Sequence, residues 1–310
     1  MYGVIIALLP ALLVSFAYFG IGSAIVCATS VLACVVFEWA INKYILRNER
    51  TTVCDGSAAL TGLLLGFNLP SNLPIWIILI GALVAIGVGK MSFGGLGCNI
   101  FNPALVGRSV LLVSFPAQMT SWPQAGQLTS YLDAETGATP LSVMKWAIKS
   151  GDPSVLQQLP DSWHLLIGHT ADGAGSLGEV CALALLIGLA FMLWRKIITW
   201  HTPVSILLTV FVLSGLLHLA NPAYADPLAV LFSGGLMLGA IFMATDYVTS
   251  PMCSRGQLIY GVGIGVLTVV IRNWGAYPEG MSFAILIMNA FTPLINTYVK
   301  PIRFGEVTKK

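Results

Sequence analysis

The chain has 310 residues, of which 56% are hydrophobic and 9% are charged, and its mean hydropathy is +0.85. These values lie far outside the range of a water-soluble domain, so we expect lipid to solvate most of the surface. A formal net charge of +2 with scattered basic residues excludes nucleic acid as a partner class. The six cysteines show no Cys-x-x-Cys or Cys/His spacing, which predicts apolar packing residues and no metal site.

Ten apolar windows are predicted to be membrane spans, because a bilayer core of roughly 30 Å needs about 20 apolar residues in a helix. The third window is short and ends at Asn68-Leu69-Pro70. It is therefore either a full span or a broken, re-entrant helix, which lipid tolerates only where other protein covers the free backbone groups. The windows cover residues 3–20, 22–45, 56–69, 73–90, 97–115, 177–194, 199–219, 225–244, 257–272 and 280–298.

The positions of Lys and Arg between these windows predict the orientation, since cytoplasmic loops are enriched in both residues. One side carries only Lys145, Lys149 and Arg272, and Arg108 lies within a span. We therefore expect both termini in the cytoplasm and residues 116–176, the only long polar stretch, outside it. The other side carries Lys43, Arg47, Arg50, Lys90, Arg195, Lys196, Arg255, Lys300, Arg303, Lys309 and Lys310.

This polar stretch divides the chain into three parts, and the fold class that we expect is an all-α integral membrane protein. Residues 1–115 form a first five-helix half, 116–176 an extracytoplasmic loop, and 177–310 a second five-helix half with a cytoplasmic C-terminal tail. Five spans per half give the halves opposite orientation, and inverted repeats build central sites from interrupted helices. The strings Asn99–Pro103 and Asn289–Pro293 match at three positions, although such short matches also arise by chance.

The polar loop contains Asp133-Ala-Glu-Thr-Gly-Ala-Thr139, followed by helical apolar spacing over Leu141–Lys149. Thr139 is predicted to cap this helix, with Pro140 at the first helical position. A helix N-terminus presents free amide hydrogens and a partial positive charge, so the same geometry suits a phosphoester on the Thr139 hydroxyl. The residues alone leave both interpretations open. The loop tryptophans Trp122, Trp146 and Trp163 are predicted to be interfacial anchors.

The same segment resembles the Asp-x-x-Ser/Thr-Gly-Ala-Thr signature at which a flavin transferase links FMN, through its phosphate, to the last threonine. Thr136 stands at the Ser/Thr position. The resemblance extends over nearly the whole chain and is to the NqrB/RnfD family of membrane subunits in redox-driven ion pumps, closer to its RnfD members. The further matching strings are Val4–Pro10, Gly94–Ala104, Gly175–Glu179, Met243–Asp246 and Tyr277–Gly280.

The resemblance implies FMN on Thr139 as a station for electrons, and a second, non-covalent flavin (riboflavin or FMN) between the membrane helices. For the second flavin we expect contacts at Gly94, Gly95, Asn99 and Asn102. The alternative is that these residues bind no flavin and only form the turn and the packing of a re-entrant segment. Glu179 either contacts FMN or caps the sixth helix. The residues expected at the covalent site are Asp133, Thr136, Gly137, Ala138, Thr139 and Glu179.

Charges inside spans are costly and face a cavity or a partner. Within the matching strings, Asp246 and Glu279 are candidates for binding Na⁺ or H⁺, and the alternative for each is a helix-end cap or a buried pair with Arg. The resemblance implies an Rnf complex of the bacterial inner membrane that relays electrons between ferredoxin and NAD. Its implied partners are the other Rnf subunits (A, B, C, E and G), lipid, and a flavin transferase for maturation.

The sequence leaves three alternatives to an Rnf subunit. One is an NqrB-like subunit of NADH:quinone reductase, and the other two are a channel and a membrane scaffold. A channel of the urea-transporter kind shares the five-plus-five architecture by fold, and fold does not settle function. Such a channel needs neither a flavin site nor a long polar outer loop. A membrane scaffold whose loop docks a partner leaves Thr139 unmodified. No nucleophile, general base or metal cluster predicts catalysis without a flavin, so we expect the chain to be inactive alone.

Overall fold

The computed structural model describes residues 1–47, 53–168 and 175–300. Within these ranges the secondary structure is helical, apart from an isolated antiparallel bridge between Pro123 and Thr136. The fold is therefore that of an all-helical membrane protein, as predicted. The C-terminal tail and four of the basic residues used to predict orientation lie outside the described residues: Arg50, Arg303, Lys309 and Lys310.

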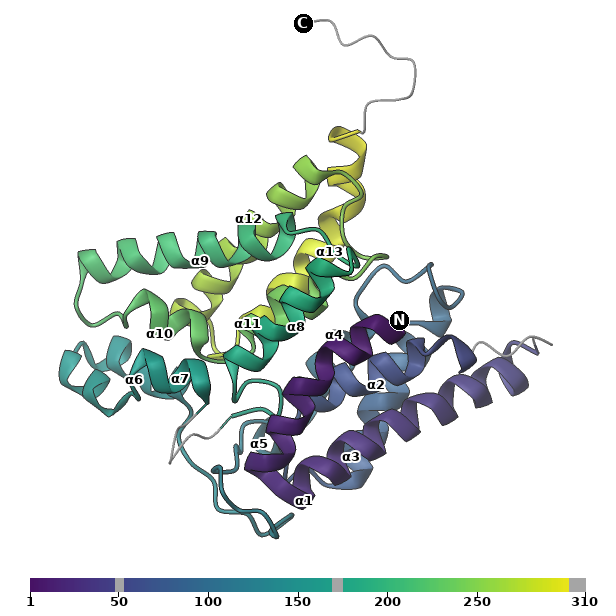
Figure 1. The fold of residues 1–310 in the computed structure, drawn as a ribbon, viewed down its shortest axis with the longest axis horizontal. Coiled ribbons are helices and arrows are strands. Elements are labelled where there is room, and N and C mark those ends of the chain that lie inside the picture. Colours follow the sequence, from purple (N-terminus) through teal and green to yellow (C-terminus); the bar gives the residue numbers. More distant parts are fainter. Residues whose placement is uncertain (48–52, 169–174, 301–310) are drawn as a thin grey trace, which may run out of the picture.

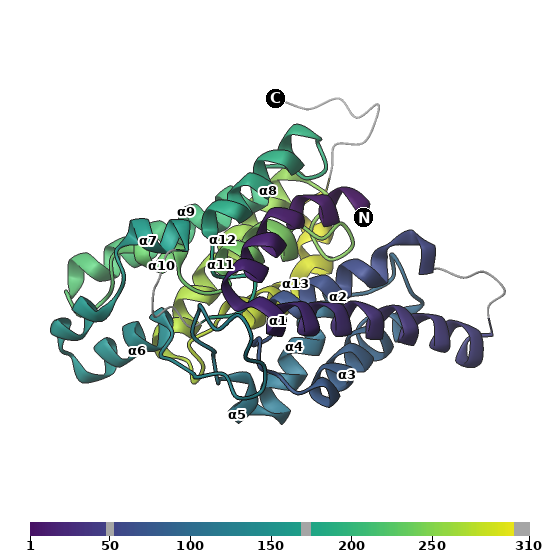
Figure 2. The same ribbon diagram turned by 60° about the horizontal axis from the view of Figure 1, so that its bottom comes forward.

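The first element, α1 (Tyr2–Ala40), consists of two helices joined at Gly20, which has φ 55° and ψ −131°. A Cβ at this position would lie 2.1 Å from the carbonyl oxygen of Leu128, so only glycine allows both the turn and the close approach. The turn falls at the predicted boundary between the first two spans. Figures 1 and 2 show the two arms of α1 diverging from this point.

The rest of the first half packs against the two arms of α1. Beyond the π-helical turn η1 (Ile41–Ile45) and the 3₁₀ turn η2 (Val53–Asp55), α2 (Ser57–Phe67) follows. Then come α3 (Ile75–Leu83), its π-helical extension η3 (Val84–Val88), the short turn η4 (Met91–Phe93) and α4 (Pro103–Ser114). Gly62 lies so close to α1 that an added Cβ would be 2.6 Å from the Cα of Val31. Small residues thus let α1 and α2 approach each other closely.

The loop between the halves carries short helices and the second half completes the bundle. The loop contains α5 (Pro116–Met119), α6 (Pro140–Ser150), η5 (Pro153–Gln158) and α7 (Ser162–Ile167). It lies on the side of the molecule away from the carboxyl end of α13 (Figures 1 and 2). The second half comprises α8 (Ala182–Trp194), α9 (His201–Ala220), α10 (Pro227–Phe232), α11 (Leu236–Leu238), η6 (Gly239–Met243), α12 (Ser254–Trp274) and α13 (Met281–Tyr298).

Several predicted spans are shorter or more broken than their apolar windows, because local backbone requirements interrupt them. The fifth window was expected from residue 97, but α4 begins only at Pro103, after Gly94, Gly95 and Gly97 with positive φ. The eighth window is divided between α10 and α11, where Gly234 has φ 67°. Hydropathy therefore located the apolar segments but missed these interruptions.

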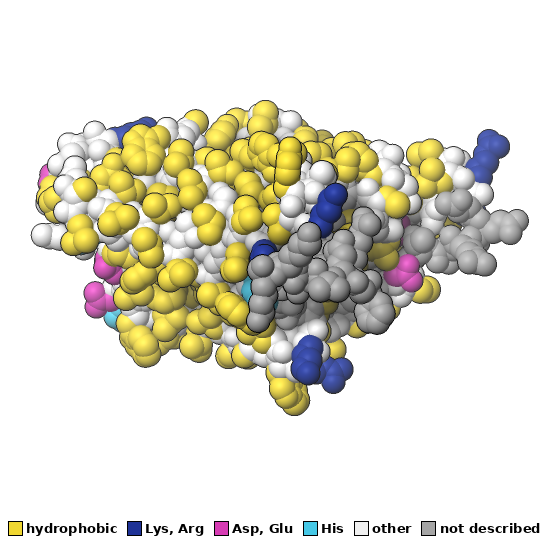
Figure 3. All heavy atoms as spheres, turned by 90° about the horizontal axis from the view of Figure 1, so that it is seen from above, with side chains coloured by type: hydrophobic (Ala, Val, Ile, Leu, Met, Phe, Trp, Pro, Cys, Tyr) yellow, Lys and Arg dark blue, Asp and Glu magenta, His cyan; other side chains and the backbone are white. Residues whose placement is uncertain are grey.

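The outer surface of the helices is apolar. Leu13, Leu32 and Leu219 expose 66%, 63% and 84% of their surface, and Figure 3 shows hydrophobic side chains covering most of one face. Large contiguous exposure of this kind is solvated by lipid in a membrane protein. Among the described residues, five helical segments are long and apolar enough to cross a membrane, and α2, α4 and α8 are shorter apolar helices.

Candidate functional site

Thr139 caps α6 as predicted. Its Oγ1 accepts a hydrogen bond from the amide of Ser142 at 3.2 Å, and its backbone is extended. Pro140 occupies the first helical position, where the missing amide hydrogen costs nothing. Thr139 is only 9% exposed, whereas Asp133 and Ala138 beside it are exposed. The hydroxyl is therefore held in a fixed place at the buried end of an otherwise accessible segment.

The segment Asp133–Thr139 is held against residues 122–127 by backbone pairing. Gly137 N donates to the carbonyl of Trp122 at 3.0 Å, and Gln124 N donates to the carbonyl of Glu135 at 2.9 Å. The side chain of Gln127 bonds both backbone groups of Glu135, at 2.9 and 2.8 Å. This pairing buries Trp122 to 7% exposure, whereas Trp146 and Trp163 are 56% and 65% exposed. The prediction that Trp122 is an interfacial anchor is therefore wrong.

Lys145 connects α6 to the chain segment that precedes α13. Its Nζ donates to the carbonyls of Gly275 and Ala276, at 2.6 and 2.8 Å. Burial, and then the positive charge of Lys149, lower the pKa of Lys145. These two hydrogen bonds place Tyr277 and Glu279 beside the N-terminus of α6. Two distant parts of the sequence thus meet at Thr139.

Two hollows border Thr139, and Glu279 lines both. The acidic hollow, defined by Thr139, Glu179, Gly234 and Glu279, contains about 520 Å³ of empty space. The aromatic hollow, defined by Trp122, Thr139, Tyr277 and Glu279, contains about 530 Å³. These volumes include space that is open to solvent, so both hollows are accessible depressions on either side of the Thr139 hydroxyl.

Buried arginines lie behind the acidic hollow. Arg108, on α4, forms an ion pair with Glu279 and donates to Asn68 and Ser282, at 3.0 and 2.6 Å. The buried pair with Arg that we considered for Glu279 is therefore present. A cation at this carboxylate would have to compete with a guanidinium that is only 3% exposed.

The break between α10 and α11 provides partners for a second arginine. Arg272 donates to the carbonyls of Val230 and Ser233, at 2.9 and 3.1 Å, which the interrupted helix leaves free. The Nε atoms of Arg108 and Arg272 and Oε1 of Glu179 are buried without a protein partner. Glu179 does not cap α8, since that helix begins after Cys181 without a side-chain cap. It lines the acidic hollow instead.

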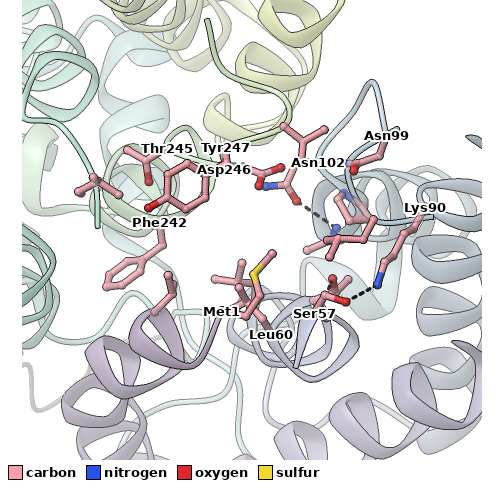
Figure 4. A pocket seen from close by; sticks show the side chains of 18 of the residues that line it. Met1, Ser57, Leu60, Lys90, Asn99, Asn102, Phe242, Thr245, Asp246 and Tyr247 are labelled. Carbon is pink, nitrogen blue, oxygen red and sulfur yellow. Dashed lines mark hydrogen bonds between the residues drawn. The ribbon is translucent and has the colours of Figure 1, made fainter. Parts of the chain in front are cut away.

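A separate inner cavity lies between the two halves and contains about 730 Å³ of empty space. Asn99, Asn102 and Lys90 border it from the first half and Asp246 from the second (Figure 4). Asn102 caps α4 through Oδ1, which accepts from the amides of Ala104 and Leu105 at 3.1 and 3.4 Å. Its Nδ2 donates to the carbonyl of Met243 at 3.2 Å, so one side chain joins the halves at the cavity wall.

Lys90 is a polar residue of this cavity that sequence reasoning missed. Charge counting placed it on the cytoplasmic side, yet it is 2% exposed, and its Nζ bonds Glu38 and Ser57 at 2.5 and 2.7 Å. Figure 4 shows Lys90 reaching Ser57 at the edge of the cavity. Glu38 lies 52 residues away in the sequence, so no local pattern signals this pair.

The predicted site residues fall into two groups. Thr139, Glu179 and Glu279 meet at the outer hollows, while Asn99, Asn102 and Asp246 meet at the inner cavity. Gly94 and Gly95 are not among the residues that line either. Asp133, Thr136 and Ala138 are exposed on the loop, and Gly137 lines the aromatic hollow. Within the described ranges no cluster of His, Cys, Asp or Glu has the geometry of a metal site.

These features define a multi-pass membrane protein with one site at its polar loop and another between its halves. Residues 1–305 match the NQR2, RnfD, RnfE family, and the chain belongs to that family.

Named relatives cover nearly all of the chain. The D subunit of the Na(+)-translocating ferredoxin:NAD(+) oxidoreductase complex of Acetobacterium woodii is 44% identical, over 100% of this chain and 91% of the relative. The D subunit of the proton-translocating ferredoxin:NAD(+) oxidoreductase complex of Clostridium ljungdahlii is 41% identical, over 98% and 91%. The D subunit of the ion-translocating oxidoreductase complex of Actinobacillus succinogenes is 39% identical, over 97% and 92%.

Proposed function

We propose that this chain is the D subunit of an ion-translocating ferredoxin:NAD(+) oxidoreductase complex. It carries FMN as a phosphoester on Thr139, relays electrons, and acts only within the assembled complex. Family membership over residues 1–305 and the names of the relatives support the assignment and favour it over an NqrB-like subunit or a urea-transporter-like channel. The relatives named for Na⁺ and for protons are 44% and 41% identical, so resemblance does not choose the ion.

The observation that carries the FMN assignment is the placement of Thr139 at a helix N-terminus with a hollow on each side. The Thr139 oxygen would carry the phosphate, near the positive end of α6. Arg108 and Arg272 offset the acidic charge of Glu179 and Glu279 behind the site. FMN, when bound, supplies the redox chemistry, and the protein supplies position and electrostatics.

The loop residues preceding Thr139 have a different role in this proposal. Asp133, Thr136 and Ala138 are exposed, and Gly137 is half-buried in the paired segment. Exposed side chains at a modification site are accessible to the enzyme that modifies it. We therefore assign Asp133, Thr136 and Ala138 to recognition by a flavin transferase, whereas Gly137 and Glu179 line the hollows that border Thr139.

The inner cavity is our proposed place for a second, non-covalent flavin. The amide of Asn99, the ammonium group of Lys90 and the carboxylate of Asp246 lie at the walls of this mostly apolar space, and the hydroxyls of Ser57, Thr61 and Thr245 add further polar groups. Gly94 and Gly95 shape the turn before Asn99 and take no direct part. Pockets with a few convergent polar groups in apolar walls are the usual form of a ligand site.

For the transported ion, the proposal favours Asp246 over Glu279. Asp246 faces the inner cavity and accepts from Thr249 Oγ1 at 3.3 Å, whereas Glu279 is already paired with Arg108. Replacement of Asp246 by Asn should reduce coupled ion transport in the assembled complex. Unchanged transport with normal electron flow would remove this assignment.

The proposed arrangement in the bacterial inner membrane follows the same scheme. Ten helical segments form two inverted five-helix halves, both termini lie in the cytoplasm, and the loop with Thr139 lies outside. The other Rnf subunits (A, B, C, E and G) and lipid surround the chain. The kink at Gly20 and the breaks near Asn102 and Gly234 support interrupted helices in both halves.

Flavin attachment is tested by co-expressing the protein with a flavin transferase and running it on a denaturing gel. We expect in-gel flavin fluorescence from the wild type, and none from Thr139→Val, because valine has the shape of threonine but no hydroxyl. Thr129→Val is the matched control and should stay fluorescent, since Thr129 is an exposed threonine of the same loop that lies outside the segment 133–139. A dark wild type, or a fluorescent Thr139→Val variant, would contradict the proposal.

A further inference from the structure

We propose that the aromatic hollow receives the flat ring of the flavin on Thr139, with Trp122 and Tyr277 as its positioning residues. This inference rests on the proposed FMN attachment and adds where the ring lies. It starts from the burial of Trp122, which sequence reasoning placed at a membrane interface.

Trp122 is held in the hollow wall by the same backbone pairing that fixes the attachment segment. Its carbonyl accepts from Gly137 N at 3.0 Å, two residues before Thr139. The adjoining bridge joins Pro123 to Thr136. The indole of Trp122 and Oγ1 of Thr139 thus belong to two short segments that are hydrogen-bonded to each other. A rigid-body movement of the loop would leave the distance between them unchanged.

Tyr277 is fixed on the same hollow from another part of the chain. Its ring stacks on Phe283, with centroids 6.4 Å apart and planes at 21°. Lys145 binds the preceding carbonyls of Gly275 and Ala276. Lys145 lies on α6, which Thr139 caps. Its two hydrogen bonds therefore fix the position of Tyr277 relative to Thr139. Two independently anchored aromatic side chains therefore border one hollow.

The chemistry of the two hollows favours the aromatic one for the ring. Flat aromatic rings gain about 0.5–1.5 kcal/mol from aromatic neighbours beyond the area that they bury. Ser142 and Thr120 also line this hollow. Their hydroxyls donate to the carbonyls of Thr139 and Pro116, so their oxygens remain as acceptors for an N–H group of the ring. Glu279 lines both hollows, but the acidic hollow adds a second carboxylate, Glu179, whose Oε1 is buried without a hydrogen-bond partner. The added carboxylate would repel the electron-rich ring of a reduced flavin.

An indole in contact with a flavin has an optical signature. On excitation the flavin accepts one electron from the indole, the electron then returns, and no light is emitted, so no net oxidation occurs. The flavin on Thr139 should therefore emit weakly in the folded protein and strongly after denaturation. A purely structural role of Trp122 would leave this emission unchanged.

The experiment measures flavin emission per covalently bound flavin in the purified native complex, with the emission of the Thr139→Val complex subtracted. We expect Trp122→Phe to raise emission severalfold and Tyr277→Phe to raise it less. Trp146→Phe is the matched control, because Trp146 is exposed on α6 and does not line the hollow. It should leave emission unchanged.

Denaturing-gel fluorescence of the same samples separates this inference from the proposed function. A dark wild-type gel overturns FMN attachment itself. Normal gel fluorescence with unchanged native emission in Trp122→Phe overturns only the placement of the ring. If Trp122→Phe fails to fold, the wild type still decides: a native emission equal to that after denaturation would contradict stacking in the aromatic hollow.

Discussion

The outer site at Thr139 and the inner cavity are built in different ways. At the outer site one contiguous segment, 133–139, supplies the attachment point and its own cap, while distant parts of the chain supply further lining residues such as Glu179, Tyr277 and Glu279. The inner cavity is instead lined by residues scattered over both halves, from Met1 and α2 in the first half to Asp246 in the second. The comparison teaches that a modification site can be local, whereas a ligand site between membrane helices depends on the whole fold.

Helix α4 links the two regions. Asn102 lies at its N-terminus on the inner cavity, and Arg108, six residues later, lies behind the outer hollows. At 1.5 Å per residue, the two are about 9 Å apart along the helix axis. Changes on α4 therefore test how separate the two sites are.

The largest effect is expected from Arg108→Met, which leaves the partly buried Glu279 without its cation. Breaking a buried ion pair typically costs about 3–5 kcal/mol. The free energy of unfolding in detergent should fall by that amount. Arg108→Met combined with Glu279→Gln removes both charges and should recover most of the loss. A single variant as stable as the wild type would show that the ion pair does not hold α4 to the segment before α13.

A smaller effect is expected from Lys145→Met, which removes two hydrogen bonds to backbone carbonyls at the outer site. Hydrogen bonds from a charged group contribute about 1.5–3 kcal/mol. Lys149→Met is the control, since Lys149 is exposed on the same helix and should change stability by less than ~0.5 kcal/mol. If the two variants lower the unfolding temperature equally, the hydrogen bonds of Lys145 do not stabilise the contact between α6 and the segment before α13.

These outcomes bear on how much the sequence could predict. Thr139 was correctly predicted as a cap because capping depends on residues within one helical turn. The burial of Trp122 and of Lys90 was not predictable, since each depends on partners that the fold brings together. The same holds for the break at Gly234, whose free carbonyls are used by Arg272.

A still smaller effect is expected at the inner cavity from Asn102→Ala. Loss of a helix cap costs about 0.5–2 kcal/mol, and the bond to the Met243 carbonyl is lost as well. Asn99→Ala is the matched control, because Asn99 lines the cavity but caps no helix. Both variants should release non-covalent flavin, as measured in protein extracts, but only Asn102→Ala should lower the unfolding temperature. If both variants retain the non-covalent flavin, the inner cavity is not its binding site.

Mass spectrometry of the peptide that contains Thr139 tests the central claim most directly. Protein matured with a flavin transferase should yield a peptide heavier by the mass of FMN less one water, with fragmentation placing the addition on Thr139. The Thr139→Val protein should yield only the unmodified peptide. An unmodified wild-type peptide, or an addition on another residue such as Thr136, would contradict the account.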